Sequence, residues 1–225
     1  MKQAGKLIIF EGSDGAGKST QVALLIKQLK KAGCLVGQLH FPQYGLFFGR
    51  LIRRYLKGEF GSIKQTNCYL ISLLYALDRW QNSTKIKRWL AQGKIVILDR
   101  YITSNMIYQT AKLNSSLSRR QYLEWLDELE FKILKIPRPD LVIFLDLPIQ
   151  ISQELITRRG RKKDLHEANQ SYLKSVQQVA NQVIKKYHWQ KIDCSRWGRI
   201  LSRWEIHQQI WKVMEQKYSR LLKKK

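Results

Sequence analysis

The chain is poor in cysteine. Its 225 residues include only three cysteines, Cys34, Cys68 and Cys194. Their number is odd, they are widely spaced and they form no C-x-x-C pair, which excludes a disulfide framework and a zinc site of the usual spacing. This usage is typical of a protein in a reducing compartment, so we expect a cytoplasmic location.

Long hydrophobic runs and clustered histidines are also missing. The longest nearly uninterrupted apolar stretch, residues 69–77, is far shorter than the roughly 20 residues that span a bilayer, and the N-terminus has no signal pattern. We therefore expect a soluble protein without a membrane partner. The four histidines are scattered and predict no metal-ligand cluster; they are His40, His166, His188 and His207.

Acidic residues are scarce. The chain has 17 Asp and Glu against 41 Lys and Arg, a formal net charge of +24. Such a charge is compatible with a nucleic-acid partner, an acidic small substrate or only a solvated basic surface. The basic residues occur along the whole chain and no DNA- or RNA-reading motif accompanies them, so a nucleic-acid partner is possible but not favoured.

What the sequence does contain is a phosphate-binding loop. The pattern G-x-x-x-x-G-K-S runs from Gly12 to Ser19. The apolar run Leu7–Phe10 precedes it and predicts a buried strand, while apolar residues at helical spacing follow it from Val22 to Leu29. The motif therefore lies between a strand and a helix, the context that phosphate binding by such a loop requires.

The residue types in this loop match its chemistry. Glycines let the backbone amides and the helix N-terminus face an anion, Lys18 reaches the outer phosphates, and Ser19 can hold Mg²⁺. We expect ATP to contact Gly12, Ser13, Asp14, Gly15, Ala16, Gly17, Lys18, Ser19 and Thr20.

Alternating strand and helix patterns predict one α/β domain over residues 1–225, a P-loop NTPase fold whose central parallel sheet of about five strands is flanked by helices. The strands are expected at 7–10, 35–41, 95–98, 141–145 and 189–193. The helices are expected after the loop, around 50–57, at 69–80, from 104, after Ser118 as a cap, before 158, at 165–187 and at 200–219.

The third apolar run ends at Asp99-Arg100. A carboxylate that can bind magnesium next to a guanidinium that can bind phosphate is a pairing that phosphoryl transfer can use. Ligands collect at the carboxyl ends of strands in such sheets, so Asp99 should lie beside the loop. Asp146 ends the next run in the same way, and we interpret it as structural.

Three basic features of the sequence each allow two interpretations. Arg53 belongs to a cationic helix face that either meets solvent or faces phosphate. Arg79 ends a helix that is apolar nearly all round, so it either forms a salt bridge or receives a ligand. Residues 158–164 carry five cations and form either a solvated loop or, as we expect, a mobile basic lid. In the lid, Arg158, Arg159 and Arg161 are candidates to stabilise the transferring charge.

Several motifs together resemble the thymidylate kinases in their order. They are the loop with Phe10-Glu11 before it, Phe41-Pro42 with Gly49, Asp78-Arg79, Asp99-Arg100-Tyr101 with Ser104, Asn105 and Tyr108, and Pro137-x-Pro139-Asp140. The resemblance implies transfer of the γ-phosphoryl group of ATP to dTMP by a homodimer with a P-loop α/β fold, and we expect Mg²⁺ as the cofactor. The alternatives are another nucleoside monophosphate kinase and a nucleic-acid-dependent P-loop ATPase.

The resemblance also implies roles by position. Lys18, Ser19 and Thr20 would hold ATP phosphates and Mg²⁺, and Asp99 would organise the metal's water shell. Asp14 would meet the acceptor sugar, Arg100 and Arg53 the acceptor phosphate. Further substrate contacts would come from Phe41, Tyr44, Tyr75 (stacked on thymine), Arg79 and Asn105 (base edge), Tyr108 and Gln109.

Three positions refine the resemblance. Asp193-Cys194-Ser195 resembles the loop beside the ATP adenine. Gly15 stands where some members of the family have an arginine, so the catalytic arginine is expected from the lid. His166-Glu167 stands where a Tyr-Glu pair is common, which leaves the role of His166 open.

Overall fold

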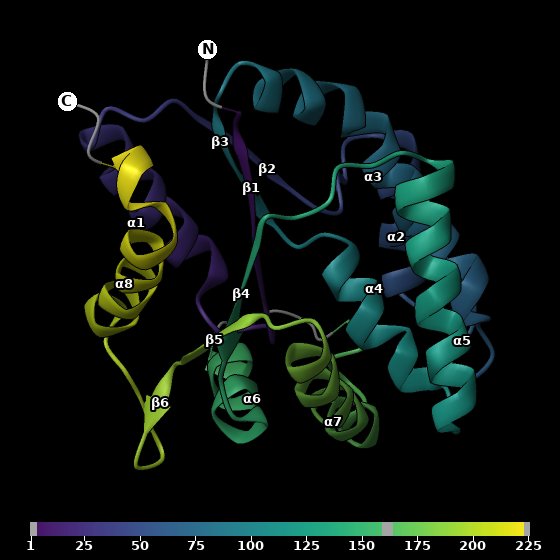
Figure 1. Ribbon diagram of the computed structural model, residues 1–225. Coiled ribbons are helices and arrows are strands. Elements are labelled where there is room, and N and C mark those ends of the chain that lie inside the picture. The colour runs from purple at the N-terminus through teal and green to yellow at the C-terminus, as the bar shows by residue number, and fades with distance from the viewer. Residues whose placement is uncertain (1–3, 159–163, 223–225) are drawn as a thin grey trace.

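The computed structural model describes residues 4–158 and 164–222. Five strands form one parallel sheet in the order β2-β3-β1-β4-β5 (Figure 1). They are β1 (Lys6–Gly12), β2 (Val36–His40), β3 (Ile95–Asp99), β4 (Leu141–Asp146) and β5 (Gln190–Asp193). The predicted parallel sheet is confirmed.

Helices connect the strands and cover both faces of the sheet (Figure 1). They are α1 (Lys18–Lys31), α2 (Phe47–Leu56), α3 (Cys68–Ala91), α4 (Ile102–Tyr108), the short 3₁₀ helix η1 (Thr110–Lys112), α5 (Ser116–Asp127), the π-helical η2 (Glu128–Ile133), α6 (Ile149–Arg158), α7 (Gln170–Lys186) and α8 (Arg203–Leu222). The strands β6 (Ser195–Arg196) and β7 (Arg199–Ile200) form a separate antiparallel hairpin that the sequence did not predict.

Successive residues of β1 serve two different cores, because side chains of a strand alternate between the faces of a sheet. Leu7 and Ile9 pack with α3, α4, α5 and α7 on one face. Ile8 and Phe10 pack with α1 and α8 on the other. A strand buried on both faces is apolar throughout, which is why this run could be recognised from the sequence.

The sheet order brings two distant segments to one edge. β3 lies next to β1, and Asp99 is the register partner of Phe10. The residues that follow β1 and β3 therefore meet at the carboxyl edge of the sheet, where ligands bind in this class of fold.

The structure corrects two helix starts and one helix length. Ser115, not Ser118, caps α5: its hydroxyl accepts a hydrogen bond from the Ser118 amide at 3.0 Å. The region expected to be helical from 165 begins as a turn, and α7 starts only after Asn169, whose side chain caps it. α3 continues to Ala91, well beyond residue 80. Its residues after position 80 are mostly polar, so the apolar pattern that marks the helix in the sequence ends before the helix does.

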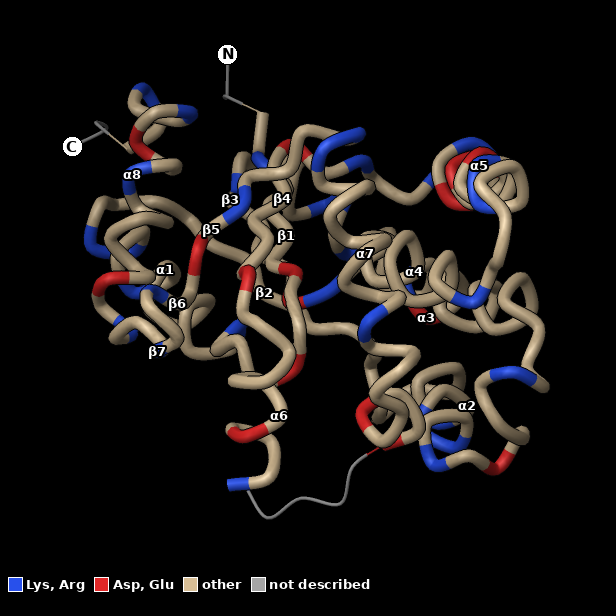
Figure 2. The backbone as a smooth tube through the Cα atoms, turned by 90° about the horizontal axis from the view of Figure 1, so that it is seen from below, with Lys and Arg blue, Asp and Glu red and all other residues tan. Residues whose placement is uncertain are grey.

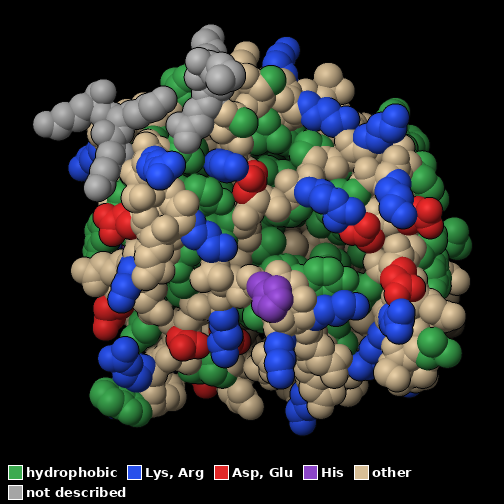
Figure 3. All heavy atoms as spheres, in the orientation of Figure 1, with side chains coloured by type: hydrophobic (Ala, Val, Ile, Leu, Met, Phe, Trp, Pro, Cys, Tyr) green, Lys and Arg blue, Asp and Glu red, His purple; other side chains and the backbone are tan. Residues whose placement is uncertain are grey.

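Basic residues lie on most helices but are missing from β2, β3 and β4 (Figure 2), and they are spread over the visible face of the molecule (Figure 3). Among the described residues, no helix has the length and hydropathy needed to cross a bilayer.

Candidate active site

The loop after β1 has the conformation that anion binding needs. Gly12 has φ 142°, and a Cβ there would lie 2.5 Å from the Leu145 carbonyl oxygen. Gly17 has φ 81° and opens α1 in the left-handed region, which costs glycine no strain. The first-turn amides of α1 have no intrahelical acceptors and point out of the helix end, where they favour negative charge.

Lys18 curls back over this loop. Its Nζ donates to the Gly12 and Ser13 carbonyl oxygens, both at 2.9 Å, and lies 3.5 Å from Asp14 Oδ1. Only 8% of the residue is exposed. Burial and the charge of Arg100 lower the pKa of Lys18, while nearby carboxylates oppose the shift.

A carboxylate network joins the loop to the segment after β3. Glu11, fully buried, accepts hydrogen bonds from Thr103 Oγ1 at 2.8 Å and Ser104 Oγ at 2.7 Å. Arg100 bridges Glu11 at 3.1 Å and Asp14 at 2.5 Å. Burial alone would raise the pKa of Asp14, but the charges of Arg100 and Lys18 outweigh it and hold that pKa below its usual range. Asp14 is therefore an anion over the whole physiological range.

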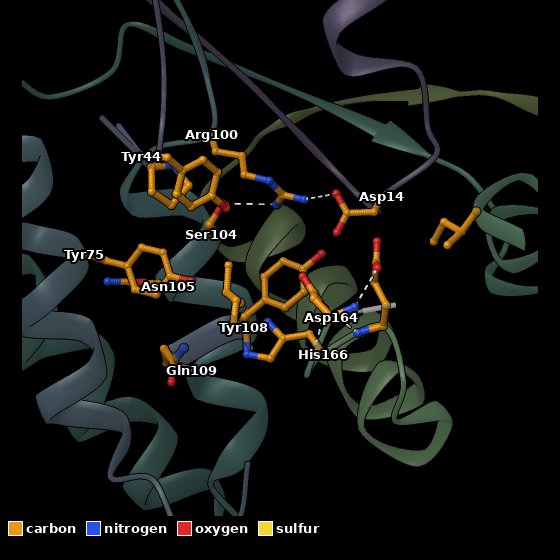
Figure 4. A pocket seen from close by; sticks show the side chains of 14 residues that line it. Asp14, Tyr44, Tyr75, Arg100, Ser104, Asn105, Tyr108, Gln109, Asp164 and His166 are labelled. Atoms are coloured by element: carbon orange, nitrogen blue, oxygen red, sulfur yellow. Dashed lines mark hydrogen bonds and ion pairs between the residues drawn. The ribbon is translucent and has the colours of Figure 1, made fainter. Parts of the chain in front are cut away.

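A pocket of about 350 Å³ opens from this network toward α3 and α4 (Figure 4). Arg100 points across its mouth toward Asp14 (Figure 4). The lining residues are Asp14, Pro42, Tyr44, Leu56, Tyr75, Arg100, Ser104, Asn105, Tyr108, Gln109, Ile156, Asp164, His166 and Glu167. Seven of these were predicted as substrate contacts, and the fold brings all seven together: Asp14, Tyr44, Tyr75, Arg100, Asn105, Tyr108 and Gln109.

The far end of the pocket is neutral and polar. Asn105 donates from Nδ2 to the Ser72 carbonyl oxygen at 3.2 Å, which fixes its amide. Gln109 is 1% exposed, and its Oε1 has no hydrogen-bond partner within the described residues. Tyr75 lies beside Asn105 (Figure 4). A buried acceptor without a partner is costly in the free protein and points to a ligand donor.

The turn at Asp164–Glu167 forms the floor of the pocket. Asp164 Oδ1 accepts from the amides of His166 at 2.9 Å and Glu167 at 2.8 Å, and the Asp164 amide donates to Glu167 Oε2 at 3.0 Å. Burial raises the pKa of Asp164 to about 6. His166 stacks on Tyr108 with ring centroids 5.5 Å apart and an interplanar angle of 13°.

Two predicted substrate contacts lie elsewhere. Arg79 does not line the pocket: its Nε donates to Glu130 Oε2 at 2.8 Å, its Nη2 pairs with Glu130 Oε1, and it is 1% exposed. Of the two interpretations of Arg79, the structure has the salt bridge, because a buried guanidinium needs a charged partner. Phe41 is buried against Tyr101, and its neighbour Pro42 reaches the pocket instead.

Several other predicted residues do not line this pocket. Arg53 is exposed and lies over the Tyr44 ring, 4.9 Å from its centroid. Cys194 is buried just after β5, and its amide donates to the Asp146 carbonyl oxygen. Asp146 itself pairs with Lys191 at 2.6 Å, a structural role. Arg158 is exposed at the end of α6, whereas Arg159, Arg161 and most of the predicted lid at 158–164 lie outside the described residues.

The two residues predicted to hold Mg²⁺, Ser19 and Asp99, both offer side-chain oxygen atoms as ligands. Within the described residues, the side chains of Ser19 and Asp99 make no hydrogen bond or ion pair with the protein. The same part of the chain holds no group of three or more His, Cys, Asp or Glu arranged for a metal. Mg²⁺ usually keeps several waters and takes few protein ligands, so two free oxygen donors beside a phosphate loop fit it.

Sequence reasoning missed Glu11, Asp164 and Glu167 as residues of this site. Glu11 carried a signal, because a carboxylate that ends an apolar strand is buried and must be paired. The Asp-x-x-Glu spacing of 164–167 is that of a reciprocal capping pair. Neither signal reveals that Glu11 and the turn at 164–167 belong to the same site.

The sheet order, the loop and the pocket at the carboxyl edge define a P-loop NTPase fold with a nucleotide-binding site. A family model described as thymidylate kinase matches residues 10–218. The thymidylate kinase of Plasmodium falciparum (isolate 3D7) is 31% identical over 195 residues, which cover 87% of this chain and 85% of that protein.

Other relatives agree. The human thymidylate kinase is 30% identical over 194 residues, covering 85% of this chain and 84% of that protein. A probable thymidylate kinase of Thermococcus onnurineus (strain NA1) is 42% identical over 163 residues, covering 70% and 74%. The solved structure of the Candida albicans thymidylate kinase matches with TM-score 0.72 at 27% identity and covers 97% of this chain and 94% of that chain. This chain belongs to the thymidylate kinase family.

Proposed function

We propose that the protein transfers the γ-phosphoryl group of ATP to dTMP. One observation carries this proposal: a single pocket of about 350 Å³ runs from the Asp14–Arg100 pair beside the phosphate loop to a neutral end that holds Tyr75, Asn105 and Gln109. A nucleoside monophosphate has the same polarity, with an anion at one end and a neutral base at the other.

At the charged end, Lys18, Ser19 and Thr20 hold the ATP phosphates. Arg100 binds the acceptor phosphate, with Arg53 as a second cation at the rim. Asp14 meets the acceptor sugar. Arg100 Nη2 lies 2.5 Å from Asp14 Oδ1. The two side chains that bind the acceptor's phosphate and sugar are therefore held in fixed positions relative to each other.

At the neutral end, Tyr75 stacks on the base, and the amides of Asn105 and Gln109 meet its edge. An amide offers both a donor and an acceptor, and thymine presents both on its Watson–Crick edge. Tyr108 packs against the sugar, and Tyr44 closes the pocket near the phosphate. We propose no base-reading role for Arg79, because Glu130 occupies its guanidinium.

In-line phosphoryl transfer needs positioning and positive charge and no nucleophilic side chain. The acceptor phosphate oxygen attacks the γ-phosphorus of ATP while the bond to the β–γ bridging oxygen breaks. Lys18 and the lid arginines counter the charge that develops between the phosphates. Ser19 would hold Mg²⁺ and Asp99 would order its water ligands, and the ion would supply positive charge to the phosphates.

We also propose a homodimer that forms through α3. Leu70, Leu73 and Trp80 lie on one face of this helix and are 65%, 36% and 49% exposed. An exposed apolar stripe is typical of a protein interface. Light scattering should give the dimer mass, and Leu73→Glu should give the monomer mass.

The three cysteines are free thiols, which supports the proposed cytoplasmic location.

The activity is tested by an ADP-release panel with the monophosphates of thymidine, deoxyuridine, uridine, cytidine, adenosine and guanosine, alongside single-stranded DNA and RNA. We expect dTMP to give the highest kcat/KM. A purine or cytidine monophosphate as best substrate would indicate another nucleoside monophosphate kinase. ATP hydrolysis stimulated only by nucleic acid would overturn the proposal.

A further inference from the structure

His166 is enclosed by three tyrosines from three different elements. Besides Tyr108 of α4, its ring contacts Tyr55 of α2 at 5.5 Å and Tyr172 of α7 at 5.3 Å between ring centroids. It is 7% exposed. Its backbone is fixed by the Asp164 carboxylate, and the Leu165 amide donates to the Leu56 carbonyl oxygen at 2.9 Å. The ring therefore has little freedom to move.

The hydrogen bonds around Tyr55 determine where the protons lie. His166 Nε2 and Tyr55 Oη are 2.8 Å apart. Lys112 Nζ donates to the same Oη at 3.1 Å and to Thr66 Oγ1 at 3.1 Å. An ammonium has no lone pair and can only donate. Because Lys112 takes only a lone pair of Oη, the single proton of Tyr55 is available to His166 Nε2. If Nε2 accepts that proton, the neutral ring carries its own proton on Nδ1.

The opposite side of the ring faces the nucleotide pocket. His166 lines that pocket together with Tyr108 and Gln109. Within the described residues, the side-chain hydrogen bond of His166 is the one between Nε2 and Tyr55 Oη, and Nδ1 makes none. The Tyr108 ring lies directly against the imidazole (Figure 4), so the position of His166 limits where Tyr108 can lie.

We propose that His166 is a positioning residue: Lys112, acting through Tyr55, holds its ring neutral with the proton on Nδ1, and the ring supports Tyr108 against the sugar of the bound nucleotide. This inference rests on the proposed function, because Tyr108 selects deoxy sugars only if a nucleotide occupies this pocket. The family's more common tyrosine at this position would fill the same space.

The surrounding charges support a neutral ring. Lys112 of η1 and Arg100 after β3 disfavour imidazolium, and Asp14 of the phosphate loop opposes them; Asp164 and Glu167 flank His166 on its own turn. Burial, followed by the charge of Lys112, lowers the pKa of His166 to about 3. Burial also lowers the pKa of Lys112 to about 8, so Lys112 is an ammonium at pH 7.

The proton arrangement is tested by long-range ¹H–¹⁵N NMR of the histidine side chains at pH 7, with His166→Tyr used to assign the His166 signals by their loss. We expect a neutral ring with the proton on Nδ1. In Lys112→Met both directions of the Tyr55–His166 hydrogen bond become possible, so a mixture of tautomers is expected. Lys185→Met, an exposed lysine of α7, is the matched control and should leave the signals unchanged. A charged ring, a proton on Nε2 in the parent, or an unaltered tautomer in Lys112→Met would overturn the arrangement.

The positioning role is tested by kinetics. His166→Ala should raise KM for dTMP about tenfold, as a loss near 1.4 kcal/mol gives, with kcat changed much less, and should reduce the preference for deoxyuridine over uridine monophosphate. His166→Tyr should restore both. His188→Asn, at an exposed histidine with φ 53° that asparagine tolerates, is the matched control. Unaltered sugar preference in a folded His166→Ala would overturn the role. If the parent fails to use dTMP, the proposed function fails, whereas the NMR experiment still tests the proton arrangement.

Discussion

At the phosphate-loop end of the pocket, Glu11, Arg100 and Asp14 hold one another by charge, whereas at the far end Tyr75, Asn105 and Gln109 are neutral and are held by packing and single hydrogen bonds. The charged end is built from one loop and the residues that follow the neighbouring strand. The neutral end is built from α3, α4 and Gln109 directly after α4. We infer that the first end supplies rate and the second selectivity, because charge acts on any phosphate while shape and hydrogen bonds distinguish bases and sugars.

The largest expected effect belongs to the charged end. Lys18→Ala should lower kcat by roughly 10³-fold, as the loss of a preorganised charge contact can, because no other loop cation faces the β–γ bridge. The fold should survive, since the lysine contacts only loop carbonyls and Asp14. Thermal unfolding checks the fold, with the exposed Lys174→Ala as control. Near-normal turnover in folded Lys18→Ala would contradict the kinase proposal.

The second effect extends the charged end to the lid. At least one of Arg158→Ala, Arg159→Ala and Arg161→Ala should lower kcat by roughly 10²-fold while KM for dTMP moves much less, because the lost charge would act mainly in the transition state. Single-turnover and steady-state kinetics separate the two parameters. If all three variants turn over like the parent, the catalytic arginine does not come from this segment.

The neutral end should control sugar choice. Tyr108 is expected to crowd the 2′ position, so deoxyuridine monophosphate should exceed uridine monophosphate in kcat/KM by at least the roughly tenfold that 1.4 kcal/mol gives. Tyr108→Ala should reduce this ratio, and the exposed Tyr187→Ala should preserve it. Equal use of both substrates by the parent would contradict this role for Tyr108.

The neutral end should also control affinity for the base. Gln109→Leu should raise KM for dTMP about tenfold with little change in kcat, because the unpartnered Oε1 is then no longer available to the ligand. The exposed Gln178→Ala serves as the matched control. A lower kcat with unchanged KM would instead place Gln109 in the chemical step and blur the distinction between the two ends.

The last prediction concerns stability and not turnover, and it involves the Asp164 carboxylate, which lines the same pocket within electrostatic range of Asp14. The pKa of Asp164 is raised from 3.8 to about 6 in the folded protein. Its contribution to stability is therefore fully present below pH 4 and is lost as pH rises through 6, a difference of up to about 3 kcal/mol at 1.36 kcal/mol per pKa unit. Asp164→Asn, whose side-chain oxygen can still accept both amide bonds, should gain stability relative to the parent from pH 4 to pH 7.

Urea unfolding at several pH values checks this prediction. Glu154→Gln, at an exposed position of α6, should show no such trend. A constant difference between Asp164→Asn and the parent across this range would mean that the turn does not penalise the charged carboxylate.

The sequence alone determined the loop, the sheet and most of the pocket. Gly12 and Gly17 need backbone angles that few other residues tolerate, and the strand runs are apolar because both faces of the sheet are buried. These constraints are local, so they appear in the sequence. Asp14, Arg100, Asn105 and Tyr108 follow directly from those elements and reach the pocket as predicted.

Only the tertiary structure decided which buried polar groups pair. Arg79 bonds to Glu130, 51 residues away, and Glu11 bonds to Thr103, 92 residues away. His166 finds Tyr55 over a separation of 111 residues. A buried charge or hydrogen-bonding group requires a partner, but any suitable side chain can satisfy it, so the sequence predicts the need for a partner while the packing of distant elements selects which one.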